Sequence, residues 1–162
     1  MHGSIGRAVA SLPAALAASV AACSSMPGAI SKADAQFTAC PAYKPAYEIT
    51  DRFMETFNAK DLALHRTTYH FPHVRIASGN VTIIPTAETE STSFARLAAE
   101  GWDHSAWASR RIVQCDATKA HMLTRFIRYR ADNSALSEFD SLYIVEFKNG
   151  KWGITARSSF AP

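Results

Sequence analysis

The last third of the chain constrains its fold more than any other segment. Four consecutive segments between residues 105 and 160 alternate side chains with a period of two, as β-strands do. Asn149-Gly150 lies between the last two segments and is typical of a two-residue hairpin turn. Residues 132–134, Asp-Asn-Ser, mark the turn before it. The pattern predicts an antiparallel meander of four strands.

The segments before the meander predict helices and one short hairpin. A first helix is expected over residues 47–58, because Ile49, Phe53, Met54 and Phe57 fall on one helical face. Asp61 can cap a second helix, with Leu62, Leu64 and Tyr69 directed inward and Pro72 at its end. Residues 74–77 and 81–84 read as two short strands around Ser78-Gly79-Asn80, and a third helix is expected over 89–101, with Gly101 as its C-cap.

With 162 residues, the chain has room for one domain with a core. We expect an α+β fold in which three N-terminal helices pack on a strongly curved, mostly antiparallel sheet and enclose one pocket. In the middle strands, both alternating sets contain large apolar residues, which indicates that both faces of the sheet are covered. The helices would cover one face, and a second copy of the chain would cover the other. The sequence therefore predicts a homodimer through the outer sheet face.

Charge and motifs narrow the range of partners. The net charge is +3, and the Lys and Arg residues form no continuous stripe, so nucleic-acid binding is not expected. The six His residues show no paired metal-ligand spacing, and we expect no metal site. The chain carries no phosphate-loop or dinucleotide-binding motif, and no cofactor is predicted.

Residues 1–23 read as a targeting segment. Residues 8–22 form an uncharged run of small apolar residues, which is typical of a secretory signal. Val20-Ala21-Ala22-Cys23 resembles a bacterial lipobox, in which Cys23 would carry the lipid that anchors the protein to the envelope. Alternatively, translation starts at Met26 and the protein is cytoplasmic, or residues 1–23 are a disordered Ala-rich leader. Residues 24–44 read as a linker, and residues 45–162 as the pocket domain.

Two cysteines remain once Cys23 is set aside. Export would permit a disulfide between Cys40 and Cys115. The alternative is a pair of unrelated free thiols, with Cys115 buried in a strand.

The order of the expected elements resembles the nuclear transport factor 2-like superfamily, and within it the SnoaL-like bacterial branch. Three segments carry the likeness, which covers about residues 45–160: residues 70–79, residues 101–107, and 149–152 followed by 157–160. The resemblance implies a cone-shaped fold with an internal pocket. It implies no single activity, because isomerases, dehydratases, cyclases, hydrolases and non-catalytic modules share this scaffold.

Isomerases of this superfamily use a carboxylate base at the first strand, and this chain departs from that pattern. No Asp or Glu occurs between Asp61 and Glu88. His70 and His73 are the substitutes, because an imidazole titrates near neutral pH, and the dehydratases of the superfamily use His with Tyr and Asp. Tyr143 and Asp51 are candidate partners of the acid/base. The alternative role of a His beside Pro72 is to hydrogen-bond backbone carbonyls.

Four residues are candidates for ligand contacts. Arg125 shares its alternating set with Leu123 and would place a cation in the pocket if that set points inward. Arg157, on the last strand, is a candidate for the same reason. For both residues the alternative is an ion pair with an Asp of the chain, or a position at the end of the strand. Tyr47 and Trp107 are the other two candidates.

Three functions follow from these residues. The first is a protein that binds a small, partly apolar molecule, with an anionic group as one option. The second is a cofactor-free lyase, isomerase or hydrolase that uses His73 or His70. The third is an envelope lipoprotein that serves as an interaction module.

Overall fold

The structure is a computed structural model that describes residues 35–162. Its elements follow one another in the order α2 (Tyr43–Asn58), α3 (Leu62–Arg66), β1 (Tyr69–Ala77), β2 (Asn80–Ile84), the 3₁₀ helix η1 (Ala87–Thr89), α4 (Phe94–Ala99), β3 (His104–Cys115), β4 (Lys119–Tyr129), β5 (Ala135–Lys148) and β6 (Lys151–Ser159). The expected α+β fold is confirmed: helices pack on an open, mostly antiparallel sheet of six strands in the order β2-β1-β6-β5-β4-β3.

The predicted meander forms the larger part of the sheet. β3, β4, β5 and β6 pair antiparallel with their chain neighbours, and β1 pairs antiparallel with β2. The hairpin turn has Asn149 and Gly150 at φ values of 54° and 77°, the left-handed region that this dipeptide favours. β1 pairs parallel with β6, and this pairing joins the short hairpin to the meander. No local sequence pattern predicted it.

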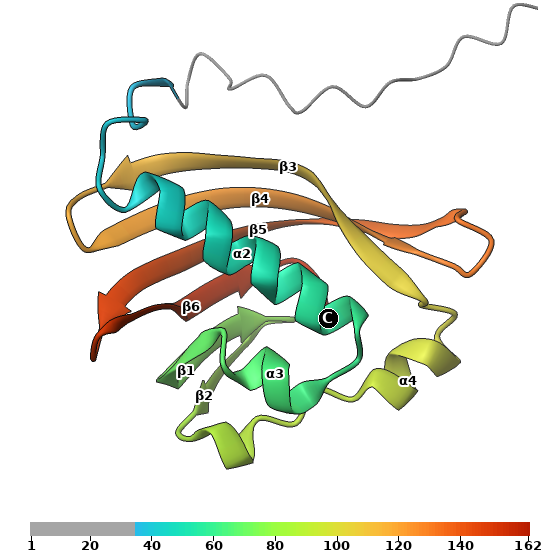
Figure 1. Ribbon diagram of the computed structural model, residues 1–162. Helices are drawn as coiled ribbons and strands as arrows, with labels where there is room; N and C mark the ends of the chain where they lie inside the picture. The colour runs from blue at the N-terminus through green and yellow to red at the C-terminus, as the bar shows by residue number, and fades with distance from the viewer. Residues whose placement is uncertain (1–34) are drawn as a thin grey trace, which may run out of the picture.

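Helix α2 lies across one face of the sheet and forms the centre of the core (Figure 1). It buries Ala46, Thr50, Phe53 and Met54, which recur at the three- and four-residue spacing of one helical face. Phe53 lies at the middle of this face, with its ring 5.8 Å from the Tyr69 ring and 5.5 Å from the Tyr143 ring. The core therefore joins α2 to both β1 and β5.

Several helix boundaries differ from the predictions. α2 begins at Tyr43, four residues early, because Pro45 falls in the first turn, where its missing N–H costs no helical hydrogen bond. α3 ends at Arg66 rather than at Pro72, which lies inside β1 where the pairing with β6 is irregular. The predicted Asp61 cap is present, since its carboxylate accepts a hydrogen bond from the Leu64 N–H. Leu64, expected to point inward, is exposed.

The third helix is shorter than predicted at both ends, and its C-cap is Glu100, one residue before the expected Gly101. The Ser93 side chain caps α4, which begins at Phe94 instead of residue 89. Gly101 has φ = 91°, and the N–H groups of Gly101 and Trp102 donate to the carbonyls of Ala98 and Leu97. This left-handed ending is the one for which glycine is favoured.

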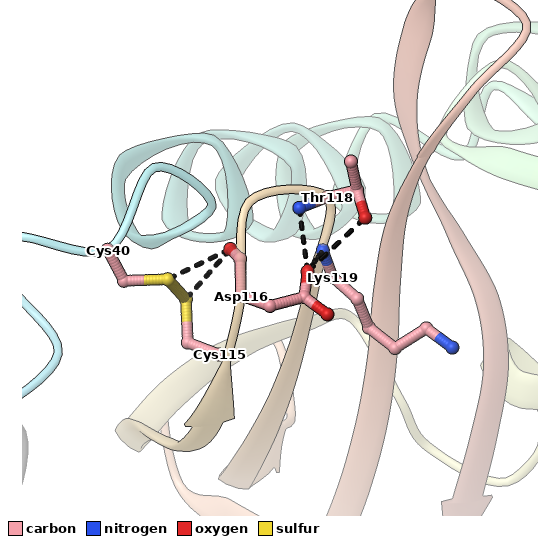
Figure 2. Close-up of a disulfide and its surroundings, with 5 residues drawn as sticks. All are labelled: Cys40, Cys115, Asp116, Thr118 and Lys119. Carbon is pink, nitrogen blue, oxygen red and sulfur yellow. Dashed lines mark hydrogen bonds between the residues drawn. A yellow bond between two sulfur atoms is a disulfide. The ribbon is translucent and has the colours of Figure 1, made fainter.

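The structure joins Cys40 and Cys115 in a disulfide, with their Cα atoms 6.3 Å apart (Figure 2). The bond links the segment before α2 to the end of β3. Beside it, the Asp116 carboxylate accepts hydrogen bonds from the N–H groups of Thr118 and Lys119, which close the turn into β4. These donors lower the pKa of Asp116.

From Ala35 onward, none of the helices is long and apolar enough to cross a membrane. The proposed targeting segment, the lipid site at Cys23 and the alternative start at Met26 lie outside the described residues.

Candidate functional site

A cavity of about 360 Å³ opens between α2, the loop that follows β2, and the inner face of the sheet. One wall is apolar, with Phe53, Phe57, Leu97 and Phe126 among its side chains. The loop over residues 85–93 supplies most of another wall. The volume lies near the lower end of the range of roughly 300–1,000 Å³ that is usual for small-molecule sites.

Arginine side chains set the charge of this cavity. Arg75, Arg128 and Arg157 line it from β1, β4 and β6, and Arg96 lies at its edge on α4. Arg96 is paired with Glu100 at 2.9 Å, so its charge is balanced. Burial lowers the pKa of Arg75 and of Arg128, which means that the surroundings disfavour these cations.

Arg157 is half-buried, and its guanidinium lies against aromatic rings of the core. Its guanidinium carbon is 5.4 Å from the centre of the Phe53 ring and 5.7 Å from that of Tyr69. It donates a side-chain hydrogen bond to the Tyr143 hydroxyl. Its Nε atom is buried and has no hydrogen-bond partner among residues 35–162. The guanidinium therefore keeps an unused donor next to the cavity.

Behind Arg157 lies a buried group of neutral polar rings formed by His65, Tyr69 and His73. Nε2 of His65 lies 3.0 Å from the Tyr69 hydroxyl, and the Tyr69 and His73 ring centres are 4.4 Å apart. Burial, reinforced by the positive charge of Arg157, lowers the pKa of both His65 and His73 to about 3. Both imidazoles are thus neutral at physiological pH.

The sequence matches the family model of NTF2-like proteins of the type DUF6841 over residues 46–160. The chain belongs to this NTF2-like family. The expected resemblance to the nuclear transport factor 2-like superfamily is confirmed. No curated protein matches the sequence.

Solved structures share the NTF2-like fold at low identity. A protein of unknown function with a cystatin-like fold from Nostoc punctiforme superposes with a TM-score of 0.60 at 14% identity, over 72% of this chain and 88% of that one. A protein of unknown function from Mycobacterium tuberculosis gives 0.59 at 16%, over 82% and 76%. A putative ketosteroid isomerase from Shewanella frigidimarina gives 0.51 at 12%, over 71% and 94%. At these identities, the similarity establishes the fold alone.

Of the candidate site residues, the structure brings Arg157 and Tyr143 together at the cavity of the NTF2-like domain. The expectation that Arg125 points into the pocket is corrected. Arg125 lies on the outer sheet face, where it pairs with Asp140 at 2.8 Å and with Glu138 at 3.1 Å. The inward set of β4 contains Arg128 instead, because that is the set that faces α2.

Tyr47, Asp51 and Trp107 lie outside the cavity lining. Asp51 is half exposed and forms an ion pair with Arg110 at 2.6 Å. The Tyr47 hydroxyl donates to the Arg110 carbonyl, and the Trp107 ring packs against Arg110 and Tyr143. These residues join α2 to β3 beside the cavity.

His70 and His73 are buried in the seam between β1, β5 and β6 rather than exposed in the cavity. Nε2 of His70 donates to the Glu146 carbonyl at 3.0 Å, and Nδ1 of His73 donates to the Ile154 carbonyl at 3.1 Å. Burial also lowers the pKa of His70. The geometry matches the alternative in which these imidazoles satisfy backbone groups.

The close fit of His70 gives a direct test of this seam. A Cβ atom added at Gly153 would lie 2.9 Å from Cδ2 and Nε2 of the His70 ring. We expect Gly153→Ala to lower the free energy of unfolding by about 2 kcal/mol, because the ring is held in place by its hydrogen bond and cannot retreat freely. Urea denaturation measures this change. In the double variant His70→Ala/Gly153→Ala, the additional cost of the alanine at position 153 should disappear, and a cost that persists would contradict the steric explanation.

Sequence reasoning missed Glu90, Arg128 and His65. Glu90 lies in the loop after η1, which has no periodicity, and His65 is the buried residue of a helix of five residues. Only the alternation of β4 pointed to Arg128, as one of two possible inward sets. Within residues 35–162, no three His, Cys, Asp or Glu side chains gather closely enough to hold a metal ion.

Proposed function

We propose that the chain binds a small acidic molecule with an apolar body in the cavity. One observation carries this proposal: Arg75, Arg128 and Arg157 line the cavity, whereas Glu90 is the one side-chain carboxylate among its described lining residues. Cations removed from water are costly unless an anion accompanies them. A guanidinium is also well suited to a carboxylate, which it can bind through two parallel hydrogen bonds.

The apolar wall defines the other end of the ligand. Phe53, Phe57 and Phe126 present aromatic surface to the same space that the arginines enter. Burial of a hydrocarbon or aromatic tail there contributes roughly 25 cal/mol for each Å² removed from water. The acid group would provide orientation, and the tail would provide much of the affinity.

Binding without catalysis is favoured over a His-dependent enzyme. His70 and His73 are outside the cavity lining, and each donates one ring nitrogen to a backbone carbonyl, so neither is placed to act on a molecule in the cavity. The cavity also favours a ligand-binding protein over a module whose interior is filled.

The test compares two probes of the same size on matched variants. We expect 3-phenylpropionate to bind at least tenfold more tightly than 3-phenylpropanol, measured by calorimetry on the full chain. Arg128→Met should remove this preference, because Arg128 lines the cavity. Arg125→Met is the control, since Arg125 lies on the outer face. Equal binding of the acid and the alcohol, or equal losses in both variants, would contradict the proposal.

We also propose that the protein is a homodimer. The outer face carries the exposed side chains of Leu123 and Phe160 beside the Arg125–Asp140 pair, which a second copy could cover. Sedimentation of a monomer alone at micromolar concentration would overturn it.

We propose that the protein is exported. The Cys40–Cys115 disulfide supports this, because such bonds persist in oxidising compartments. Fractionation of cells that express the full chain, and its Cys23→Ser variant, tests both export and the lipid anchor.

A further inference from the structure

Glu90 holds an unusual position in the cavity wall. The residue is 4% exposed although it lies in a loop, and it is one of the residues that line the cavity. Hydrogen bonds to both its backbone carbonyl and its side chain hold Glu90 in place. The Glu90 carbonyl accepts a hydrogen bond of 2.6 Å from Nη2 of Arg66. Oε1 of Glu90 accepts from the backbone N–H of Thr92 at 3.1 Å and from its hydroxyl at 2.7 Å.

The second carboxylate oxygen of Glu90, Oε2, accepts no such hydrogen bond from residues 35–162. Oε2 is buried and has no hydrogen-bond partner within the part of the chain that the structure describes. Glu90 also forms no ion pair with any Lys, Arg or His of residues 35–162, although Arg157 lies within electrostatic range of it. An ionised carboxylate only accepts hydrogen bonds, and leaving one of its oxygens buried and unpaired is costly. A molecule in the cavity that donates a hydrogen bond would remove this cost.

The cavity thus offers two kinds of recognition. The guanidinium groups of Arg75, Arg128 and Arg157 can only donate, and they suit an anion. Oε2 of Glu90 can only accept, and it suits a hydroxyl or an ammonium group. A hydroxyl is the better match, because three cations against one carboxylate leave the cavity with excess positive charge, which disfavours an ammonium group.

We propose that the ligand is a hydroxy acid with an apolar chain, and that Glu90 is the residue that recognises its hydroxyl group. The ligand hydroxyl would donate to Oε2, its carboxylate would bind the arginines, and its chain would lie against Phe53 and Phe126. This ligand class presupposes the acid-binding cavity proposed above. Glu90 then decides which acids are selected, because an acid without the hydroxyl places its apolar surface against a buried carboxylate.

The experiment compares 3-phenyllactate with 3-phenylpropionate, which differ by one hydroxyl group, by calorimetry on the full chain. Each enantiomer of phenyllactate is measured separately. We expect one enantiomer to bind about tenfold more tightly than phenylpropionate, since a hydrogen bond to a charged acceptor is worth about 1.5–3 kcal/mol. In Glu90→Gln, this preference should shrink to less than about twofold, because the neutral amide cannot offer a charged acceptor. Phenylpropionate itself should bind the Gln variant more tightly than wild type.

A second variant separates loss of recognition from disturbance of the loop. Thr92→Val removes the hydroxyl that donates to Oε1 but leaves Oε2 in place, so the preference for phenyllactate should persist. Persistence of the full preference in Glu90→Gln, or a wild type that favours phenylpropionate, would overturn the role of Glu90. If Arg128→Met weakens both acids while Glu90→Gln changes neither, acid binding stands and this inference fails. Absence of binding by either acid would remove the acid-binding proposal, and this one with it.

Discussion

Removal of the Cys40–Cys115 disulfide is expected to lower the free energy of unfolding by about 4 kcal/mol. The two cysteines are 75 positions apart, so the cross-link closes a long loop in the unfolded chain. Loss of the cross-link restores the conformational freedom of that loop, and the chain-entropy model assigns about 4 kcal/mol to a loop of this length. Guanidinium denaturation of the wild type and of Cys115→Ser, both without reductant, measures the difference.

The matched variants make this prediction specific. Cys40→Ser and Cys115→Ser remove the same bond and should lose the same stability, whereas Cys23→Ser keeps the bond and serves as the control. A loss of stability below about 1 kcal/mol in Cys40→Ser and Cys115→Ser would show that the disulfide contributes little. A loss in Cys23→Ser as large as in these two variants would show the same.

The disulfide also affects the position of the cavity wall. It fixes the segment before α2 to the end of β3 (Figure 2), and α2 carries Phe53 and Phe57 to the cavity. The Arg110–Asp51 ion pair links α2 itself to β3. Helix α2 is thus attached to the sheet at its start and along its length, which stabilises the apolar wall.

The sequence predicted the parts of the fold that local chemistry determines. The Asn149-Gly150 turn and the Asp61 cap each depend on a few adjacent residues and were found where expected, and Gly101 ends α4 one residue after its C-cap. The α+β class followed from periodicity. The parallel pairing of β1 with β6 joins segments about 80 residues apart, and no local signal encodes it.

The candidate site was harder to predict for two physical reasons. Arg125 and Arg128 are identical side chains on one strand, and only the packing of α2 on one face decides which of them faces the cavity. The histidines were difficult for a different reason, because their environment depends on residues that are distant in the sequence. His73 was a candidate acid/base, but its environment, and that of His65, is set by burial and by Arg157 from a distant strand. Proximity of this kind is a property of the folded chain.

These two histidines lead to the second large effect, which is loss of stability in mild acid. His65 and His73 have pKa values of about 3 in the folded protein, against the model-peptide value of 6.5. Between these values, the unfolded chain binds protons that the folded chain does not, so the stability that the neutral imidazoles provide is complete above about pH 7.5 and falls as the pH decreases toward 3. Lowering the pH from 6.5 to 4.5 should cost about 5 kcal/mol for the two imidazoles together.

Urea denaturation at a series of pH values measures this effect. Above pH 7.5 neither imidazole gains a proton in either state, so their contribution should be flat there, which supplies an internal control. His65→Asn and His73→Asn will be less stable at pH 7, since each loses buried hydrogen bonds. Each variant should nevertheless lose less additional stability between pH 6.5 and 4.5 than the wild type, and the double variant should lose least. If the wild-type stability does not change across this interval, the two imidazoles accept protons in the folded protein as readily as in the unfolded chain. That result would contradict the conclusion that His65 and His73 are buried in the neutral form.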